Sequence, residues 1–480
     1  MIKEKTSKYI EIISPIAFIL LTLIIGIFRI PFYDETHAYI ISQLSFGEIF
    51  QLSRIEGHPI LWYLLLKPFN SLSFYPYSMM IINWIFASLM ILILWKKAPF
   101  NSFIKFFLTF SYPFFQYFGI VSRPYTLGVL VVFLLCVFYK NSAKKPILYS
   151  FLLISCANIS VITTFVAFGF GVLFLQKVIK NKLVKKDIIC TCVIFLIGLI
   201  FLCSQFLYVE TPKMQSNNAH MLFLRHLFYF IFIPFAEFKS KNIIQVALQL
   251  TCSVSFFYFS FLFFKKAKDS LILFFLSVTP MLLLFVFIYI GDFWHYYLIF
   301  VVYLCALWVN WDKFKNNKTA NVLFILLILL NMSSYAITQN GKNQTNQPVF
   351  YKKTLDIILN TKDYKNSKLF CFNYYSHVCP GLLLYLKKEN IVLYDNQNND
   401  ISSFISIRNM QNLEYKKLNI DEFIGYLDKN KNNYLIATSN KIADYQSFNY
   451  AEGNKTIYFD LVEQHPELYL LIYKLRYKVH

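Results

Sequence analysis

Carboxylate and imidazole side chains collect in two short stretches near the start of the chain. The first reads Phe32-Tyr33-Asp34-Glu35-Thr36-His37, and the second reads Glu56-Gly57-His58-Pro59. Ionisable groups of these types beside apolar segments are, by default, a functional-site hypothesis. The alternative is a solvated loop whose acids cap a helix, and the residues by themselves leave both interpretations open.

The composition indicates which elements must position these groups. The chain has 480 residues, of which 57% are hydrophobic, 19% aromatic and only 15% charged, whereas soluble proteins carry about 25% charged residues. Long apolar runs, such as Ile16 to Ile27 and Phe195 to Cys203, lie between short lysine-rich breaks. The composition therefore predicts a polytopic membrane protein and excludes a soluble enzyme, a disordered chain, collagen and a coiled coil.

A membrane span takes about 20 mostly apolar residues, and the chain offers about eleven such segments. They are 9–29, 76–95, 102–120, 124–139, 146–157, 159–176, 187–207, 243–264, 270–290, 293–311 and 319–337. The pair 146–157 and 159–176 is short for two spans, so one span with a re-entrant piece is the alternative. The first segment lacks a small-residue cleavage site, and we expect it to be a retained anchor.

The lysines predict the orientation of these spans. Lysine and arginine favour the cytoplasmic side, and every second break is rich in lysine, from Lys3, Lys5 and Lys8 to Lys313, Lys315 and Lys318. We therefore expect a cytoplasmic N-terminus in the cytoplasmic membrane, a first outer loop at 31–75 and an extracytoplasmic segment at 338–480. The net charge of +20 is then mainly inner-surface lysine, and nucleic acid is not an expected partner.

This topology gathers the titratable residues of the membrane half at the outer face. Every histidine before residue 338 falls there: His37, His58, His220, His226 and His295. Acids of the outer loops join them: Asp34, Glu35, Glu48, Glu56, Glu210, Glu237 and Asp292. We therefore expect a site for an extracytoplasmic reaction.

The segment after residue 338 has a different pattern, which predicts a small α/β domain. Residues 368–373, 391–394 and 434–438 have the pattern of short strands, and 379–388 that of a helix. Cys371 and Cys379 fall in this domain, where they either pair as a disulfide or remain reduced.

Three features resemble the GT-C superfamily of polyprenyl-phosphate-sugar glycosyltransferases. They are the acidic pair just after the first span, the stretch Gly57-His58-Pro59-Ile60-Leu61-Trp62-Tyr63, and Arg123-Pro124-Tyr125 opening a later span. The nearest resemblance is to the bacterial branch related to protein mannosyltransferases, the lipid A aminoarabinose transferase and the rhizobial lipopolysaccharide core transferases. It covers the order of elements across nearly the whole chain and implies a helical GT-C-like membrane domain, residues 1–337, with a small outer α/β domain, residues 338–480.

The resemblance implies an inverting glycosyltransferase. A monosaccharide would move from a polyprenyl-phosphate donor, undecaprenyl phosphate in bacteria, to a glycolipid, polysaccharide or protein acceptor of the cell envelope. Asp34 would take the acceptor proton as general base, with Glu35 in support. Backside attack would invert the anomeric centre, and the phosphate leaving group would need no acid.

The leaving phosphate would need cations at the same surface. Arg123 suits bidentate phosphate contact, with His295 and Tyr125 as further contacts, although Arg123 could be an interface anchor and His295 part of an aromatic belt. Glu56, His58 and His37 are candidates for contacts with the substrate or with a divalent metal. A metal is possible, and no cofactor is required.

One departure from the superfamily pattern concerns the next outer loop. Many members carry an acid there, whereas Gly119-Ile120-Val121-Ser122-Arg123-Pro124 has none, which puts metal dependence in doubt. Two other classes compete with the transferase: a polysaccharide polymerase or flippase, with its charge in a later loop or a central pore, and a secondary transporter, with ionisable groups at mid-span and paired broken helices. The charged first loop and the apolar span interiors favour the transferase.

Overall fold

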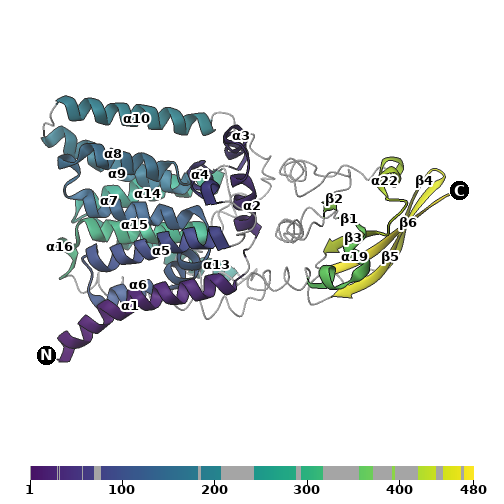
Figure 1. Cartoon of the computed structure of the whole chain (residues 1–480). Coiled ribbons are helices and arrows are strands. Elements are labelled where there is room, and N and C mark those ends of the chain that lie inside the picture. The colour runs from purple at the N-terminus through teal and green to yellow at the C-terminus, as the bar shows by residue number, and fades with distance from the viewer. Residues whose placement is uncertain are drawn as a thin grey trace. The chain divides into compact units, whose positions relative to one another are not determined.

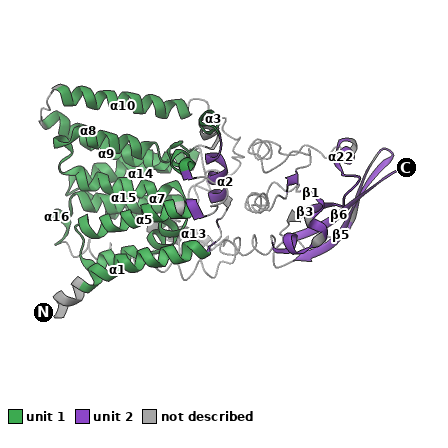
Figure 2. Cartoon of the chain, in the orientation of Figure 1, with its two compact units in different colours: residues 1–28, 45–68, 79–342 green, residues 29–44, 69–78, 343–480 purple. Residues whose placement is uncertain are grey.

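The computed structural model describes residues 2–29, 31, 33–56, 58–69, 77–181, 185–206, 243–287, 293–316, 356–370, 392–394, 420–438, 447–465 and 470–480. The chain forms two compact units, which Figure 2 colours separately. Unit 1 comprises residues 1–28, 45–68 and 79–342, and unit 2 comprises 29–44, 69–78 and 343–480. Two pieces of the predicted first outer loop thus belong to unit 2.

Unit 1 is helical. Its principal helices are α1 (Ile2–Phe28), α3 (Phe46–Glu56), α4 (Leu61–Leu66), α5 (Tyr77–Lys97), α6 (Ser102–Thr109), α7 (Pro124–Tyr139), α8 (Pro146–Ala157), α9 (Val161–Asn181), α10 (Lys185–Phe206), α13 (Ile243–Phe264), α14 (Lys268–Phe287), α15 (Phe293–Val309) and α16 (Trp311–Phe314). Most of the long helices run side by side in Figure 1, where α8 packs on α9 and α10, and α14 packs on α9 and α15.

The long helices of unit 1 have the apolar surface of a membrane protein. Among the described residues, 5 helices are long and apolar enough to cross a bilayer: α1, α5, α9, α10 and α14. Shorter apolar helices occupy 124–139, 146–157, 254–264 and 295–309. The predicted span 319–337 lies outside the described residues, and the number of about eleven crossings stays a prediction.

The predicted span 102–120 is not one continuous helix. The structure has α6 followed by a separate π-helix, η3 (Pro113–Phe118). Pro113 explains the break, because proline has no N–H to donate and its ring clashes with the preceding turn of a helix. A helix that starts at Pro113 avoids both problems, since the first residue of a helix has no intrahelical partner for its N–H.

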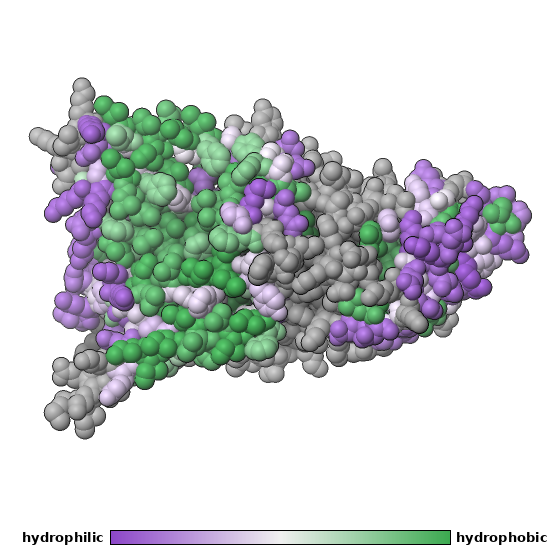
Figure 3. Space-filling view, in the orientation of Figure 1, coloured by the Kyte–Doolittle hydropathy of each residue, from purple (hydrophilic) through white to green (hydrophobic). Residues whose placement is uncertain are grey.

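The lysine-rich breaks of unit 1 meet at one end of its helices. Lys140, after α7, lies 3.2 Å from Asp312 of α16, and Lys177 of α9 donates to the carbonyl of Tyr139 at 2.7 Å. Tyr139 in turn donates to Asp269, at the start of α14, at 2.7 Å. In Figure 3 hydrophilic residues mark this end, at the left, and hydrophobic residues cover the flanks of the helices. Lys140 and Lys177, from two of the lysine-rich breaks, therefore lie at the same end of the helices.

Unit 2 contains α2 (Tyr33–Ser42), α19 (Lys362–Lys365), α22 (Ile420–Tyr426) and a sheet of 6 strands in the order β2-β1-β3-β6-β5-β4. The strands are β1 (Lys368–Phe370), β2 (Leu393–Tyr394), β3 (Asn433–Thr438), β4 (Phe448–Glu452), β5 (Lys455–His465) and β6 (Leu470–Val479). β1 pairs in parallel with β2 and β3, and the remaining pairs are antiparallel. The predicted small C-terminal sheet is confirmed.

The core of this sheet follows the alternation of its long strands. Ile457 and Phe459 of β5, and Leu471 and Leu475 of β6, point into one cluster of buried side chains together with Phe423 of α22. Alternate residues of a strand share a face, so one helix covers one face of the sheet. The predicted helix at 379–388 and the cysteines at 371 and 379 lie outside the described residues.

Candidate functional site

Arg123 stands at the start of α7, at the end of that helix opposite to the lysine-rich breaks. Its backbone is extended, with φ −126° and ψ 159°, and Pro124 is the first residue of the helix. A residue before proline is disfavoured in helical conformation, and proline is favoured at the first helical position. The Arg-Pro dipeptide therefore ends the preceding segment and begins α7, which leaves the half-buried Arg123 at the helix terminus.

Tyr125 is the residue around which the predicted donor-site residues meet. Its fully buried side chain places the phenol oxygen 2.7 Å from Nε2 of His295 in α15. The guanidinium carbon of Arg123 lies 5.8 Å from the centre of the Tyr125 ring. The His58 ring packs edge-on to the same ring, with 6.4 Å between centroids. The structure thus brings together His58, Arg123, Tyr125 and His295, here called the Tyr125 cluster.

The electrostatics of the Tyr125 cluster favour an anion. Tyr125 is in the first turn of α7, and His295 is in the first turn of α15. The N-terminus of a helix carries a partial positive charge and unsatisfied N–H groups, and such termini bind phosphates. Arg123 adds a full charge whose planar donors match phosphate oxygens. Arg123 and the two helix starts therefore give this region a positive potential.

Aromatic side chains form a wall beside the Tyr125 cluster. Tyr117, on the π-helix, packs against Tyr125 at 6.1 Å and against Tyr297 at 5.9 Å between ring centroids. Phe285 packs against His295 at 6.2 Å. The imidazole and phenol groups are therefore seated in an apolar surround, which strengthens a charge interaction relative to water.

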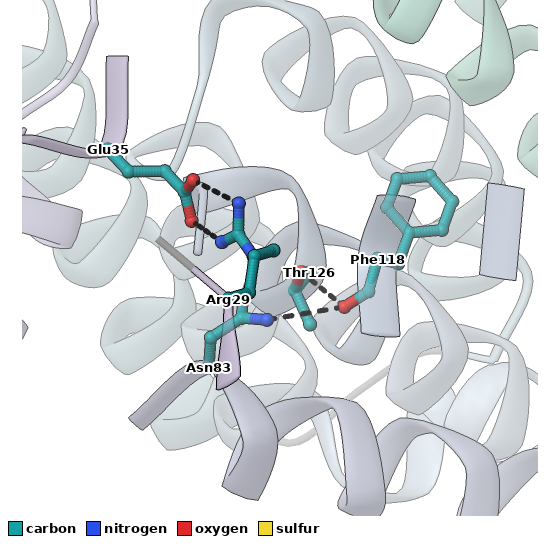
Figure 4. A network of polar contacts seen from close by, with 5 residues as sticks. All are labelled: Arg29, Glu35, Asn83, Phe118 and Thr126. Atoms are coloured by element: carbon teal, nitrogen blue, oxygen red, sulfur yellow. Dashed lines mark hydrogen bonds and ion pairs between the residues drawn. The ribbon is translucent and has the colours of Figure 1, made fainter. Parts of the chain in front are cut away.

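The π-helix is fixed to the start of α7 by the carbonyl of Phe118. Thr126 donates to this carbonyl at 2.8 Å and the Nδ2 of Asn83 at 3.5 Å, as the dashed lines of Figure 4 show. π-helical segments are rare and occur frequently at functional sites. Side chains of α5 and α7 thus hold the last residue of the π-helix, which precedes Arg123 by five positions.

The acidic pair lies in the first turn of α2, in unit 2. Both oxygens of Glu35 bind the guanidinium of Arg29, with Nη1 to Oε2 at 2.7 Å and a second contact between Nη2 and Oε1, drawn in Figure 4. Glu35 is fully buried and the Arg29 side chain is 14% exposed. The interpretation of this stretch as a solvated loop is wrong for Glu35.

The other acidic and imidazole candidates of the first loop differ in their surroundings. Asp34 is half-buried at the start of α2 and His37 is buried one turn later, on neighbouring positions of one helix face. Glu56 is the last residue of α3, and its side chain lies outside the described part. The candidates of the later outer loops, Glu210, His220, His226, Glu237 and Asp292, are also outside it.

No metal centre is visible among the described side chains. In this part of the chain, no group of three or more His, Cys, Asp or Glu residues is arranged to hold a metal ion. Metal dependence therefore stays open.

The sequence did not identify Arg29 as the ion-pair partner of Glu35 or Tyr117 as a neighbour of Tyr125. Arg29 is a cation directly after the first span, six positions before Glu35, and that spacing was the available signal. Tyr117 is one of many aromatic residues in the apolar segments, and no sequence signal distinguished it from the rest.

Neither the models of known protein families nor the curated proteins match this chain. Two groups of residues have the geometry that bears on function: the Tyr125 cluster in unit 1, and the Arg29–Glu35 pair with Asp34 in unit 2.

Proposed function

We propose that the chain is an inverting glycosyltransferase that moves a monosaccharide from a polyprenyl-phosphate donor to an acceptor of the cell envelope. The observation that carries the proposal is the convergence of His58, Arg123 and His295 on the side chain of Tyr125. These residues come from three separate segments, and together they supply a cation, two imidazoles and two helix starts to one small region. The surrounding helices are apolar enough to lie in a membrane, where a polyprenyl chain would be dissolved.

In this proposal the Tyr125 cluster binds the phosphate that leaves. The acceptor oxygen forms a bond to the anomeric carbon, and the bond from that carbon to the phosphate oxygen breaks, with its electron pair going to the phosphate. The charge that develops on the leaving oxygen is stabilised by Arg123 and by the donors around Tyr125. Removing one such donor typically lowers a rate by a factor of about 10² to 10³.

Asp34 is the proposed general base, which takes the proton of the attacking hydroxyl. Glu35, both of whose oxygens bind Arg29, is assigned the supporting role. Glu35 then supports the site by anchoring the first turn of α2. The reaction is assigned to the outer face of the cytoplasmic membrane, because lysine-rich breaks favour the cytoplasmic side and the Tyr125 cluster is at the other end of α7.

The experiment is a transfer assay with purified protein in lipid nanodiscs, a panel of radiolabelled polyprenyl-phosphate monosaccharides and extracted envelope acceptors. Wild type is compared with Asp34→Asn and with Asp312→Asn, which makes the same chemical change at an exposed position of the lysine-rich end. We expect label on an acceptor, with one polyprenyl phosphate released per sugar, for wild type and for Asp312→Asn. We expect no transfer above background for Asp34→Asn.

Full transfer by folded Asp34→Asn would remove the assigned base. A polymerase of envelope glycans predicts a different result: lengthened glycan chains without release of polyprenyl monophosphate. A flippase predicts no transfer in nanodiscs and, in sealed proteoliposomes, donor moved across the bilayer. Either product pattern from wild type would replace the proposal by that alternative.

A further inference from the structure

Gln205, close to the end of α10, has a fully buried amide and follows the apolar stretch 193–203 of that helix. Its Oε1 accepts a hydrogen bond of 2.8 Å from the backbone N–H of Ile60, 145 positions away in the chain. Its Nε2 donates at 3.0 Å to Oδ1 of Asn158 and at 3.0 Å to the carbonyl of Phe201. A polar side chain in a membrane helix is expensive and commonly functional, and this one has a partner for both ends of its amide.

Asn158 fixes the orientation of the Gln205 amide. It follows α8, and its Nδ2 donates to the carbonyl of Ile154 at 2.9 Å, so its Oδ1 is the end that faces Gln205. The Oδ1 of Asn158 can only accept, which requires the nitrogen of Gln205 on that side and the oxygen toward Ile60. Both amides therefore have one orientation that satisfies all their bonds.

The hydrogen bond that Gln205 accepts comes from the backbone N–H of Ile60, at the start of α4. Ile60 is the N-cap of this helix. The backbone N–H of an N-cap residue is commonly satisfied by a Glu or Gln three residues later in the same helix, whereas here Gln205 of another helix accepts it. Between Ile60 and His58 stands Pro59, whose ring fixes its own φ and restricts the residue before it. Few backbone torsions are therefore left to move His58 once Ile60 is held.

We propose that Gln205 is a positioning residue for His58. It holds the His58-Pro59-Ile60 segment so that the His58 ring stays edge-on to Tyr125 at 6.4 Å. The inference rests on the proposed function for the consequence in catalysis, whereas the positioning itself is a property of the fold that can be tested without a substrate.

The catalytic consequence is tested with a double-mutant cycle on the full-length protein in nanodiscs. Gln205→Met removes donor and acceptor at similar volume. Gln205→Glu, whose carboxyl group is kept protonated by burial, restores an acceptor for Ile60 and a donor for Asn158. The control is Cys203→Ser, on the same turn of α10 with an exposed side chain. We expect Gln205→Met to lower kcat/KM for the polyprenyl-phosphate sugar about tenfold, Gln205→Glu to recover part of it, and Gln205→Met to have no further effect in a His58→Ala background. Additive losses in the two backgrounds would overturn the proposal.

The positioning is tested by hydrogen–deuterium exchange at the amide of Ile60. An amide whose acceptor is lost exchanges faster because its local opening becomes easier, so we expect at least about tenfold faster exchange in Gln205→Met and none of this acceleration in Cys203→Ser. Unchanged protection would overturn the proposal whatever the transfer assay gives. Lost protection in a protein that transfers no sugar from any donor would uphold the anchoring of Ile60 by Gln205 and count against the proposed function alone.

Discussion

The phenol oxygen of Tyr125 and the Nε2 of His295 are 2.7 Å apart, although the two residues are 170 positions apart in the chain. This hydrogen bond joins the first turns of α7 and α15 at the end of unit 1 remote from the lysine-rich breaks. It fixes the ring on which Arg123 and His58 converge, so it sets the geometry of the proposed phosphate site.

The Tyr125–His295 bond predicts coupled losses on mutation. Tyr125→Phe removes the hydroxyl and leaves the ring, and His295→Phe removes the imidazole and leaves an aromatic side chain. Each change should weaken donor binding about tenfold, and the double variant should lose little more than either single one, because a shared hydrogen bond is lost only once. Dissociation constants for polyprenyl phosphate, measured in nanodiscs for the four proteins, check this. Fully additive losses would show that the two residues act separately.

The Arg29–Glu35 pair predicts a loss of stability. Glu35→Gln removes the carboxylate charge that pairs with a largely buried guanidinium, and breaking such a pair costs about 3–5 kcal/mol. Thermal unfolding in detergent should show a clear fall in the midpoint for Glu35→Gln and for Arg29→Ala. Their apolar double replacement, Arg29→Met with Glu35→Leu, should recover much of the loss.

The control for this pair is Glu48→Gln. Glu48 is an exposed acid of the same loop that accepts hydrogen bonds from Ser45 at the start of α3, and glutamine can replace glutamate in such a cap. Its midpoint should stay near that of wild type. An unchanged midpoint for Glu35→Gln would mean that the ion pair is not structural.

The crossing of α9 and α14 predicts opposite effects at two glycines of one helix. A Cβ at Gly169 would lie 2.3 Å from Oγ of Ser277 and 3.2 Å from the carbonyl of Leu273, whereas a Cβ at Gly171 would meet nothing within 4 Å. Gly169→Ala should destabilise by about 1–3 kcal/mol through overpacking. Gly171→Ala should be neutral or stabilise by up to about 1 kcal/mol, because alanine favours the helix. Equal unfolding midpoints for the two variants would contradict the close helix approach.

The Arg476–Asp460 pair in the sheet of unit 2 predicts that stability depends on pH in the acid range. Arg476 of β6 donates from Nε to Asp460 of β5 at 2.5 Å, and this bond lowers the pKa of the Asp460 carboxyl. A carboxyl whose pKa is lowered in the folded state contributes its full stabilisation of that state when the pH is above the unfolded pKa of about 3.9. The contribution is lost as the pH falls through the folded pKa.

The pair on β5 and β6 is largely exposed, so its effect on stability should be small. Thermal unfolding of the sheet, followed by tyrosine circular dichroism at pH 6 and pH 2.5, should show a smaller acid-induced fall in Asp460→Asn than in wild type. The same fall in both proteins would assign the acid sensitivity to other groups.

The sequence was sufficient to predict that His58, Arg123 and His295 lie at one end of the helices. The reason is that positive charge alternates from break to break, and each break reverses the chain direction. Loop positions as far apart as 58 and 295 are then brought to the same side without any knowledge of packing. The Arg-Pro dipeptide also predicted where α7 begins, because the backbone preferences around proline are local.

The pairing of individual side chains could not be predicted in the same way. The bonds from Gln205 to Ile60 and from Tyr125 to His295 depend on which helices are neighbours. Apolar helices have similar sequences, so the sequence does not indicate which of them pack together. The break at Pro113 was open to prediction, because proline interrupts a helix. The hairpin of β5 and β6 also had a signal, the alternation of Ile457 with Phe459 and of Leu471 with Tyr473 and Leu475.

The measurement that tests the account most directly is the preference of the protein for polyprenyl phosphate over the corresponding polyprenol, which lacks the phosphate. Binding to both is measured by native mass spectrometry for wild type, Arg123→Ala and Lys144→Ala, the last removing an equal charge at an exposed position of the lysine-rich end. Wild type and Lys144→Ala should prefer the phosphate by about 10- to 100-fold, the range of a charged hydrogen bond, and Arg123→Ala should lose most of this preference. An equal preference in Arg123→Ala and wild type would contradict the assignment of the Tyr125 cluster as the phosphate site.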